Sequence, residues 1–242
     1  RYYGKLSGLP ILEPSSVAEA KEMIAYAFDL SEELQEPVIF RTTTRINHST
    51  AVVTLGDIAP RVTQGDFVKD PFSYVTVPAV SRNLHVTLLE NMKLAQGIAN
   101  DSRWNFVDGE GSHGVIANGV SYAYVKDAVA DLGLDGQVKI LRLGFTHPMP
   151  EALVAGFLKT CTDVLVVEEG EPYMEEAVKA IAQSHALTLK IQGKGEGLFS
   201  RLYEFDPAMV KQVMSRVFNV PFTAVDPLDL SDIPEIPGRP PT

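Results

Sequence analysis

Four short apolar runs decide the fold: GVIAN at 114–118, VKILRL at 138–143, VLVVE at 164–168 and TLKIQ at 188–192. They start 24, 26 and 24 residues apart, and a segment with the apolar period of a helix fills each gap. Strands that alternate with helices at this spacing are typical of βαβ units, in which helices cover both faces of a parallel sheet. The spacing therefore predicts an α/β domain in which a small open sheet holds these four strands in parallel.

The segments between and after these runs carry helix signals. Proline is tolerated at a helix start, because the N–H that it lacks would have no partner in the first turn. Pro172 and Pro207 stand at such starts, and Asp206 is placed to cap the helix that Pro207 opens. The predicted helices span 121–132, 150–159, 172–185 and 206–218.

The first hundred residues predict two further helices and one strand. Ser16 and Glu19 have the spacing of a capping box, in which each side chain bonds a free backbone N–H of the other. The helix that follows stops at Pro37, and the apolar run 38–40 suits a buried strand. After a long connection, Ser81 is expected to cap a helix that ends near Asn100. The apolar stripes of the two helices are Ala20, Met23, Ala27, Leu30 and Leu34, and Leu84, Leu88, Met92, Ala95 and Ala99.

The apolar face of the first of these helices and the strand after it need cover. A bare strand edge and a bare apolar face both promote association. We expect residues 38–41 and the face over 20–34 to be covered by the α/β domain, by the helix over 81–100 or by a second copy of the chain. Dimerisation or domain swapping is the expected means, because symmetric contacts satisfy both copies.

Composition excludes several classes of protein. The 242 residues carry 21 basic and 31 acidic side chains, a net charge of −10, which disfavours binding to nucleic acid and to anionic membranes. Apolar residues make up 45% of the chain, as in a soluble globular protein, and no apolar run approaches the ~18 residues of a membrane span. A single cysteine excludes an internal disulfide, a cysteine zinc site and an iron–sulfur cluster held by this chain alone. These features predict a cytoplasmic protein.

The two ends predict a piece of a larger polypeptide. The chain begins at Arg1 without a methionine or a signal-peptide pattern. Its last ten residues contain four prolines, which is typical of a semi-rigid linker.

Several clusters could have a catalytic or binding role, but each also has a structural explanation. The glycine-rich stretch 193–197 follows a strand but lacks both phosphate-loop patterns, so a contact between domains or subunits is favoured over a phosphate cradle. Glu168, Glu169 and Glu171 could act as an acid–base group, but favourable charge at a helix N-terminus is the simpler reading. The acidic stretch 108–113 has too few oxygen ligands for a calcium loop and is interpreted as a turn.

Two single residues, His147 and Cys161, also call for a choice between a functional and a structural role. His147 lies at a strand end, at the edge where open α/β sheets bind ligands, although a structural role is favoured. No two of the five histidines stand four residues apart, which disfavours a zinc site. Cys161 precedes an apolar strand and is expected to be a packed, unreactive thiol.

The densest polar cluster is RTTTR at 41–45 with Asn47, His48 and Ser49. It follows a buried strand, and its two arginines and its hydroxyls could hold a carboxylate or a phosphate. The alternative, a solvated strand end with hydrogen bonds across an interface, is weighed equally. The candidate residues are Arg41, Thr43, Thr44, Arg45 and His48.

Several of these stretches resemble one enzyme family. The run RYYGKLSGLPILEPSS at 1–16 and the run PVIFRTTTRINHS at 37–49 are similar to the α subunit of indolepyruvate:ferredoxin oxidoreductases, within the 2-oxoacid:ferredoxin oxidoreductase family. FVKDP at 67–71 and VPA at 77–79 resemble the connection that follows in that family. Residues 114–124 and 138–170 resemble its transketolase C-terminal-like domain.

The resemblance implies the chemistry of a parent enzyme. Such enzymes decarboxylate aryl pyruvates on thiamine diphosphate, pass two electrons through iron–sulfur clusters to ferredoxin and transfer the acyl group to coenzyme A. It also implies magnesium at the diphosphate, a β subunit as partner and homodimer contacts. By the same resemblance, the Arg41–His48 element lies near the parent's catalytic cleft.

The resemblance further divides the chain into parts. Residues 1–53 correspond to the end of the pyrimidine-binding domain, 54–100 to a connection and helix, 101–225 to the transketolase C-terminal-like domain and 226–242 to a proline-rich linker. The glutamate that activates the aminopyrimidine is expected before Arg1, and the diphosphate-binding domain and cysteine clusters after Thr242. The segment itself is therefore expected to be structural, to hold no cofactor or metal and to be inactive.

Two other classes of function stay open. The chain could be a free-standing α/β module that binds a nucleotide or coenzyme A at the carboxyl edge of its sheet. It could also be a small acidic electron carrier that resembles flavodoxin, but no hydroxyl-rich phosphate loop follows its first strand.

Overall fold

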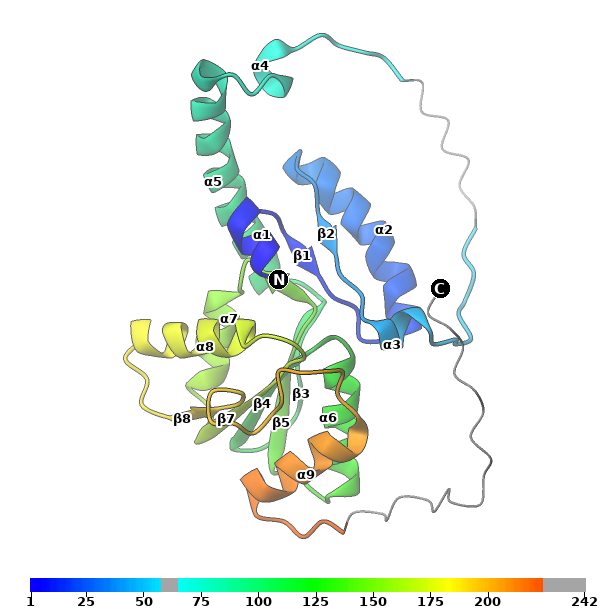
Figure 1. Ribbon diagram of the computed structural model, residues 1–242, viewed down its shortest axis with the longest axis vertical. Coiled ribbons are helices and arrows are strands. Elements are labelled where there is room, and N and C mark those ends of the chain that lie inside the picture. The colour runs from blue at the N-terminus through cyan, green and yellow to red at the C-terminus, as the bar shows by residue number, and fades with distance from the viewer. Residues whose placement is uncertain (58–64, 224–242) are drawn as a thin grey trace.

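The computed structural model describes residues 1–57 and 65–223, and its larger sheet has five strands in the order β3-β5-β4-β7-β8 (Figure 1). Four of them are mutually parallel and match the four apolar runs, so the predicted sheet is confirmed. β3 pairs with β5 in the antiparallel direction and forms an edge that the sequence did not predict. The strands are β3 (Asn105–Gly109), β4 (His113–Asn118), β5 (Val138–Leu143), β7 (Asp163–Val167) and β8 (Lys190–Gln192).

The link from β3 to β4 crosses the start of β5, which lies between them in the sheet. Gly111 has φ +135°, and a Cβ on it would stand 2.0 Å from the carbonyl oxygen of Gln137. Only glycine fits such a close approach of two backbones. The stretch 108–113 is therefore the end of one strand, this crossing and the start of the next, where a turn alone was expected.

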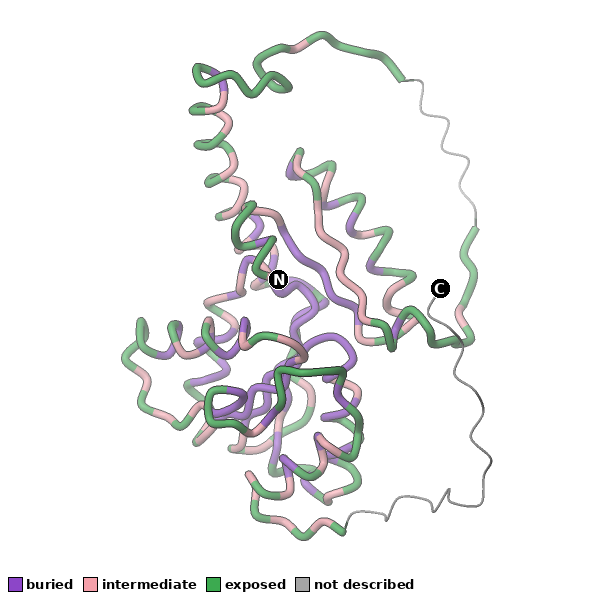
Figure 2. The backbone as a smooth tube through the Cα atoms, viewed as in Figure 1, coloured by how far each residue is buried: buried purple, intermediate pink, exposed green. Residues whose placement is uncertain are grey.

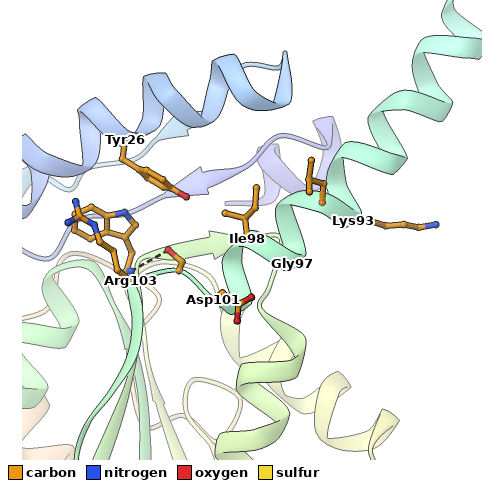
Figure 3. A pocket seen from close by; sticks show the side chains of 9 residues that line it. Tyr26, Lys93, Gly97, Ile98, Asp101 and Arg103 are labelled. Carbon is orange, nitrogen blue, oxygen red and sulfur yellow. Dashed lines mark hydrogen bonds between the residues drawn. The ribbon is translucent and has the colours of Figure 1, made fainter.

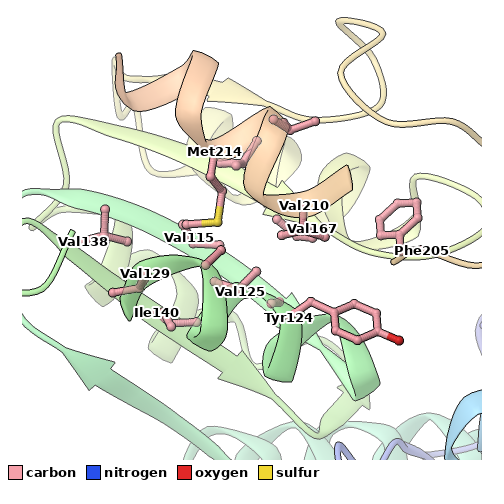
Figure 4. Packing of buried hydrophobic residues seen from close by; sticks show 14 of the residues in the cluster. Val115, Tyr124, Val125, Val129, Val138, Ile140, Val167, Phe205, Val210 and Met214 are labelled. Carbon is pink, nitrogen blue, oxygen red and sulfur yellow. The ribbon is translucent and has the colours of Figure 1, made fainter. Parts of the chain in front are cut away.

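Helices cover both faces of this sheet. One face is covered by α6 (Gly119–Asp131) and α9 (Pro207–Phe218), and the other by α7 (Glu151–Leu158) and α8 (Tyr173–Ser184). Buried side chains alternate between these faces along each strand. Val115 and Ala117 lie with Val138 and Ile140 on the α6 and α9 face, as Figure 4 shows for the valines and Ile140, whereas Ile116 lies on the α7 and α8 face. Because both faces are buried, the central strands carry apolar residues at successive positions, as at Val115–Ala117 and Val164–Val167, which is why they stand out in the sequence.

The predicted helices agree with these four elements to within two residues at each end. Asp206 caps α9 as expected, because its carboxylate accepts a hydrogen bond from Met209 N at 2.8 Å.

A second, three-stranded sheet attaches the first fifty residues to the α/β part. β1 (Ile11–Leu12) pairs in parallel with β2 (Ile39–Phe40) and antiparallel with β6 (Phe145–His147), in the order β2-β1-β6. β6 follows β5 almost directly along the chain, so the two sheets are linked through adjacent strands. Strands of two or three residues have no detectable period, and neither β1 nor β6 was predicted. The short helices α1 (Tyr2–Ser7) and α3 (Thr44–Asn47) were missed for the same reason.

The apolar face of α2 (Val17–Leu34) is covered, as expected. Met23, Ala27, Leu30 and Leu34 are buried, whereas Ala20 is only half-buried. The cover comes from the same copy of the chain, namely Leu12, Trp104, Phe145 and the residues Ala95 and Ala99 of the long helix that ends at Asn100. The strand after it is less protected, since Val38, Ile39 and Phe40 are half-buried.

The start of α2 differs in detail from a capping box. The Ser16 hydroxyl accepts from Glu19 N at 3.2 Å as predicted, but the Glu19 carboxylate bonds the N–H and hydroxyl of Ser15. It also pairs with the guanidinium of Arg142, which is fully buried on β5. Glu19 therefore joins α2 to the larger sheet as well as capping the helix.

The helix α5 (Pro78–Asn100) begins three residues before the predicted cap. Pro78 is its first residue and Ser81 lies inside the first turn, so Ser81 as N-cap was wrong. The N-terminal half of α5 stands away from the body and is mostly exposed, together with α4 (Pro71–Tyr74) before it (Figures 1 and 2). No helix among the described residues is long and apolar enough to cross a membrane. The predicted linker over 226–242 lies outside the described residues.

Candidate functional site

The Arg41–His48 element leaves the carboxyl end of β2 and folds back as α3. Ile46 anchors α3 in the core beside Val120 and Tyr124 of α6. This anchor holds α3 against the larger domain. The element therefore lies where the small sheet meets the first helix of the parallel sheet.

Glu13 is the hub of this junction. Its side chain is 2% exposed, and it accepts hydrogen bonds from Arg1 Nε at 2.9 Å, from Thr146 Oγ1 at 2.8 Å and from Arg41 Nη1. Burial acts to raise the pKa of Glu13, but the charges of Arg1 and Arg41 and the hydrogen bonds from Arg1 and Thr146 outweigh it and lower the pKa to about 2. Glu13 is therefore a carboxylate at any physiological pH, and it holds Arg41 in one orientation.

Arg41 keeps free hydrogen-bond donors. Its side chain is 31% exposed, and only Nη1 bonds to another described residue. Two residues later, Thr43 Oγ1 is shielded from solvent and has no hydrogen-bond partner among the described residues. A buried hydroxyl without a partner is rare, and a guanidinium with free N–H groups matches the geometry of a carboxylate. Arg41 and Thr43 together are thus suited to bind an anionic group.

The other three candidates lie apart from this pair. Arg45 is half exposed and pairs with Glu204 at 3.0 Å, in the loop before α9. Thr44 and His48 are exposed at the two ends of α3. The structure therefore brings Arg41 to the Glu13 hub, with the shielded Thr43 hydroxyl two residues later, and leaves Thr44, Arg45 and His48 on the surface.

The carboxyl edge of the parallel sheet is filled by the chain itself. The strand order reverses between β4 and β7, which is the place where open α/β sheets bind ligands. Arg1 occupies it: Nη1 lies 2.9 Å from Glu168 Oε2 and Nη2 lies 3.4 Å from Asn118 Oδ1. Glu168 accepts hydrogen bonds from the N–H groups of Met174 and Glu175 at 2.9 Å. It therefore places a carboxylate at the N-terminus of α8, which is the structural role favoured from the sequence.

The glycine-rich loop 193–197 surrounds a carboxylate of the same chain. Glu175 accepts hydrogen bonds from Lys194 N at 2.6 Å, from Gly195 N at 3.1 Å and from Lys179 Nζ at 2.6 Å. A Cβ on Gly193 or Gly195 would stand 2.6 or 2.7 Å from that carboxylate. The glycines are needed for this approach, and Glu175 takes the position that a phosphate would need.

His147 and Cys161 have structural partners. His147 Nδ1 lies 2.6 Å from the hydroxyl of Tyr173, and burial, with a smaller effect of Lys5, lowers its pKa to about 4. Burial raises the pKa of the Cys161 thiol, which donates to the carbonyl of Phe157 at 3.2 Å, as a packed thiol would. Within 1–57 and 65–223, no three histidine, cysteine or acidic side chains are grouped as metal ligands.

The hub itself was not predicted from the sequence. Arg1, Glu13 and Thr146 received no role, although they fix the orientation of Arg41. One signal was present: Glu13 is a lone charge in the otherwise apolar stretch PILEP at 10–14, and a charge in such a stretch is rarely buried without a partner.

Comparison with known proteins identifies close relatives, although no family model matches the chain. It is 40% identical over 245 residues to the indolepyruvate oxidoreductase subunit IorA of Methanothermobacter thermautotrophicus, covering 100% of this chain and 39% of the relative. The same subunit of Pyrococcus abyssi is 38% identical, over 100% of this chain and 39% of the relative. That of Archaeoglobus fulgidus is 36% identical over 91% of this chain and 34% of the relative.

Solved structures support the fold. A 2-oxoglutarate:ferredoxin oxidoreductase from Magnetococcus marinus, solved with 2-oxoglutarate, coenzyme A and succinyl-CoA, superposes with a TM-score of 0.56 at 18% identity, over 87% of this chain and 42% of that one. An inactive split-gene transketolase superposes with a TM-score of 0.50 at 14% identity, over 88% of this chain and 59% of that one. The expected transketolase C-terminal-like fold is consistent with both.

The resemblance seen in the sequence is thus confirmed over the full chain, which spans about two fifths of the length of the curated relatives that it matches. The chain is similar, along its whole length, to a segment of the IorA subunits of indolepyruvate oxidoreductases.

Proposed function

We propose that this chain is the part of an indolepyruvate:ferredoxin oxidoreductase subunit that joins its pyrimidine-binding domain to its transketolase C-terminal-like domain. The observation that carries the proposal is 40% identity to an IorA subunit along the entire chain. The parent enzyme would oxidatively decarboxylate aryl pyruvates to acyl-CoA, with ferredoxin as electron acceptor and a β subunit as partner. We retain the proposed division at 1–53, 54–100, 101–225 and 226–242, the homodimer contacts and a cytoplasmic location.

The residues of this chain suit the substrate better than the cofactors. Thiamine diphosphate, when bound, supplies the carbanion chemistry of such enzymes, and magnesium holds its diphosphate. The described part of this chain has no cluster of metal ligands, its glycine loop is filled by Glu175, and its one cysteine cannot hold an iron–sulfur cluster. We infer that these groups are held by other parts of the parent enzyme.

Arg41 is the residue we assign to substrate binding. Its free guanidinium N–H groups and the unpartnered Thr43 hydroxyl lie on one short segment, and they can bind the carboxylate of a 2-oxo acid. Glu13 contributes by holding the far side of the guanidinium, so that little side-chain entropy is lost when the substrate binds. Arg45 and His48 would lie further out along the same side of α3 and line the approach to this pair.

The test uses Arg41→Gln in the complete enzyme, with the β subunit present. Loss of a charged hydrogen-bond pair to the substrate raises the KM for an aryl pyruvate by about tenfold or more, since such a bond contributes about 1.5–3 kcal/mol. Arg82→Gln on the exposed half of α5 is the matched control and leaves the KM unchanged. An unchanged KM in Arg41→Gln contradicts the assignment.

A second test uses this chain alone. Calorimetry with thiamine diphosphate and magnesium is expected to give no binding tighter than millimolar, or roughly −4 kcal/mol. Micromolar binding would show that the chain holds the cofactor site itself. The alternative of a free-standing module for a nucleotide or coenzyme A is disfavoured, because Arg1 and Glu175 occupy the two places where a phosphate would bind.

A further inference from the structure

A hollow of about 630 Å³ lies where α2, the last turns of α5 and the loop 101–104 meet (Figure 3). Tyr26 comes from α2, Leu94 and Ile98 come from α5, and Trp104 comes from the loop. These elements are separate from those that carry Arg41 and Thr43. The proposed function leaves this hollow without a role.

Gly97 forms part of the wall, and nothing in the packing requires it. It lies inside α5, where glycine weakens a helix relative to alanine. A Cβ on it would meet no atom within 4 Å, and its φ is not positive. The effect of this glycine is to leave the helix backbone bare beside Ile98, as Figure 3 shows.

Two aromatic rings close one end of the hollow. The ring centroids of Tyr26 and Trp104 are 6.2 Å apart, with an interplanar angle of 52°. Trp104 is 5% exposed, and its indole N–H has no hydrogen-bond partner among the described residues. Side chains from Leu94 and Ile98 complete an apolar surface that suits a flat ring.

Arg103 supplies a polar group with free donors. Its Cζ lies 4.2 Å from the centroid of the Trp104 ring, so the guanidinium is stacked on the indole. Its ion pair with Glu22 has a separation of 3.5 Å, with both side chains more than 60% exposed, and it donates no hydrogen bond within the described ranges. A guanidinium held flat with unused N–H groups is a carboxylate receptor.

We propose that this hollow binds a small molecule that carries a planar aromatic ring and a carboxylate. The ring packs between Tyr26 and Ile98 over the bare backbone of Gly97, and the carboxylate binds the guanidinium of Arg103. Lys93 adds a positive charge, whereas Glu22 and Asp101 add negative ones. Recognition therefore rests on the direct hydrogen bonds from Arg103, not on the net charge of the site. The inference holds whether or not the parent enzyme acts on aryl pyruvates.

The chain contains one tryptophan, so Trp104 reports on this hollow without interference. Phenylacetate is the probe, and the readouts are the single indole N–H resonance and the tryptophan fluorescence of the complete chain. We expect a saturable shift of the indole resonance with phenylacetate. The neutral isostere phenylacetamide and the ring-free acetate bind at least tenfold more weakly.

Two variants test the two halves of the proposal. Gly97→Leu fills the hollow and abolishes the shift, whereas Gly156→Leu leaves it intact, because Gly156 is also an exposed helical glycine with no atom within 4 Å of a Cβ. Arg103→Gln reduces the affinity for phenylacetate to that for phenylacetamide. Circular dichroism verifies folding, and Gly97→Ala serves in place of Gly97→Leu where the larger residue disturbs α5.

Three results would overturn the inference. One is the absence of a saturable shift up to ~10 mM phenylacetate, well above the range of a specific weak site. Another is a shift that survives in Gly97→Leu. Equal affinities for phenylacetate and phenylacetamide in the unaltered chain would remove the carboxylate from the proposal.

Discussion

Glu13→Gln removes the negative charge at the hub between the two sheets but keeps the shape of the side chain. The pKa of Glu13 falls from its ordinary value of 4.5 to about 2 in the folded chain. At about 1.4 kcal/mol for each pKa unit, this change corresponds to about 3 kcal/mol of stability at pH 7. Breaking a buried ion pair by removing one partner costs about 3–5 kcal/mol, a similar magnitude. Arg1 retains Glu168 in the variant, so we expect the lower value of about 3 kcal/mol.

The dependence on pH gives this prediction its sharpest form. The folded pKa of Glu13 lies below the unfolded one, so its stabilisation is complete above about 4.5 and disappears as the pH falls toward about 2. Glutamine cannot titrate. The difference in unfolding free energy between the natural chain and Glu13→Gln should therefore shrink steadily over that range.

Urea denaturation, followed by the fluorescence of the single tryptophan, measures the difference at pH 7 and at about pH 3. Glu204→Gln is the matched control, because Glu204 pairs with Arg45 at the surface with both side chains 50% exposed, and it should cost less than about 1 kcal/mol. A cost for Glu13→Gln below about 1 kcal/mol at pH 7, or a cost that does not change with pH, would refute the assignment of Glu13 as a charged hub.

Two further substitutions and one titration test particular contacts. Gly111→Ala places a Cβ against the carbonyl of Gln137 and should lower the unfolding free energy by about 3 kcal/mol or more. The control Gly133→Ala places a Cβ that meets no atom, so it should cost only the strain of its positive φ, about 1 kcal/mol. Thermal denaturation compares the two variants. Glu19→Gln leaves the buried guanidinium of Arg142 without its carboxylate and should cost about 3 kcal/mol in urea denaturation, and a cost equal to that of Glu204→Gln would contradict the pairing. His147 should titrate near pH 4 in NMR spectra, because burial lowers its pKa. Its neutral form therefore stabilises the fold above the ordinary pKa of 6.5, and this stabilisation is lost as the pH falls toward 4. A titration midpoint near 6.5 would show that the ring is not desolvated.

The sequence by itself determined the parallel sheet and its helices. Strands that are buried on both faces, such as Val164–Val167 within β7, are apolar at every position and are visible without any alignment. The cap at Asp206 and the stripe from Met23 to Leu34 were equally legible, because each depends on residues within one or two helical turns. The 41–45 cluster was visible as a polar patch after a strand, and its resemblance to the oxidoreductase family was visible with it.

Only the tertiary structure decided which polar residues act together. Arg1 and Glu168 are 167 positions apart, and Glu13 meets Thr146 across 133 positions, so no local period records either contact. The two-residue strand β1 brings them together, and a strand that short carries no pattern of its own. Likewise, the loop 193–197 has the composition of an anion cradle, but the anion it surrounds is Glu175 from the preceding helix. Local patterns reveal which side chains of a segment are buried, whereas the partner of a buried charge depends on how distant segments pack. That packing gave Arg41 a buried carboxylate as partner and left Thr44, Arg45 and His48 on the surface.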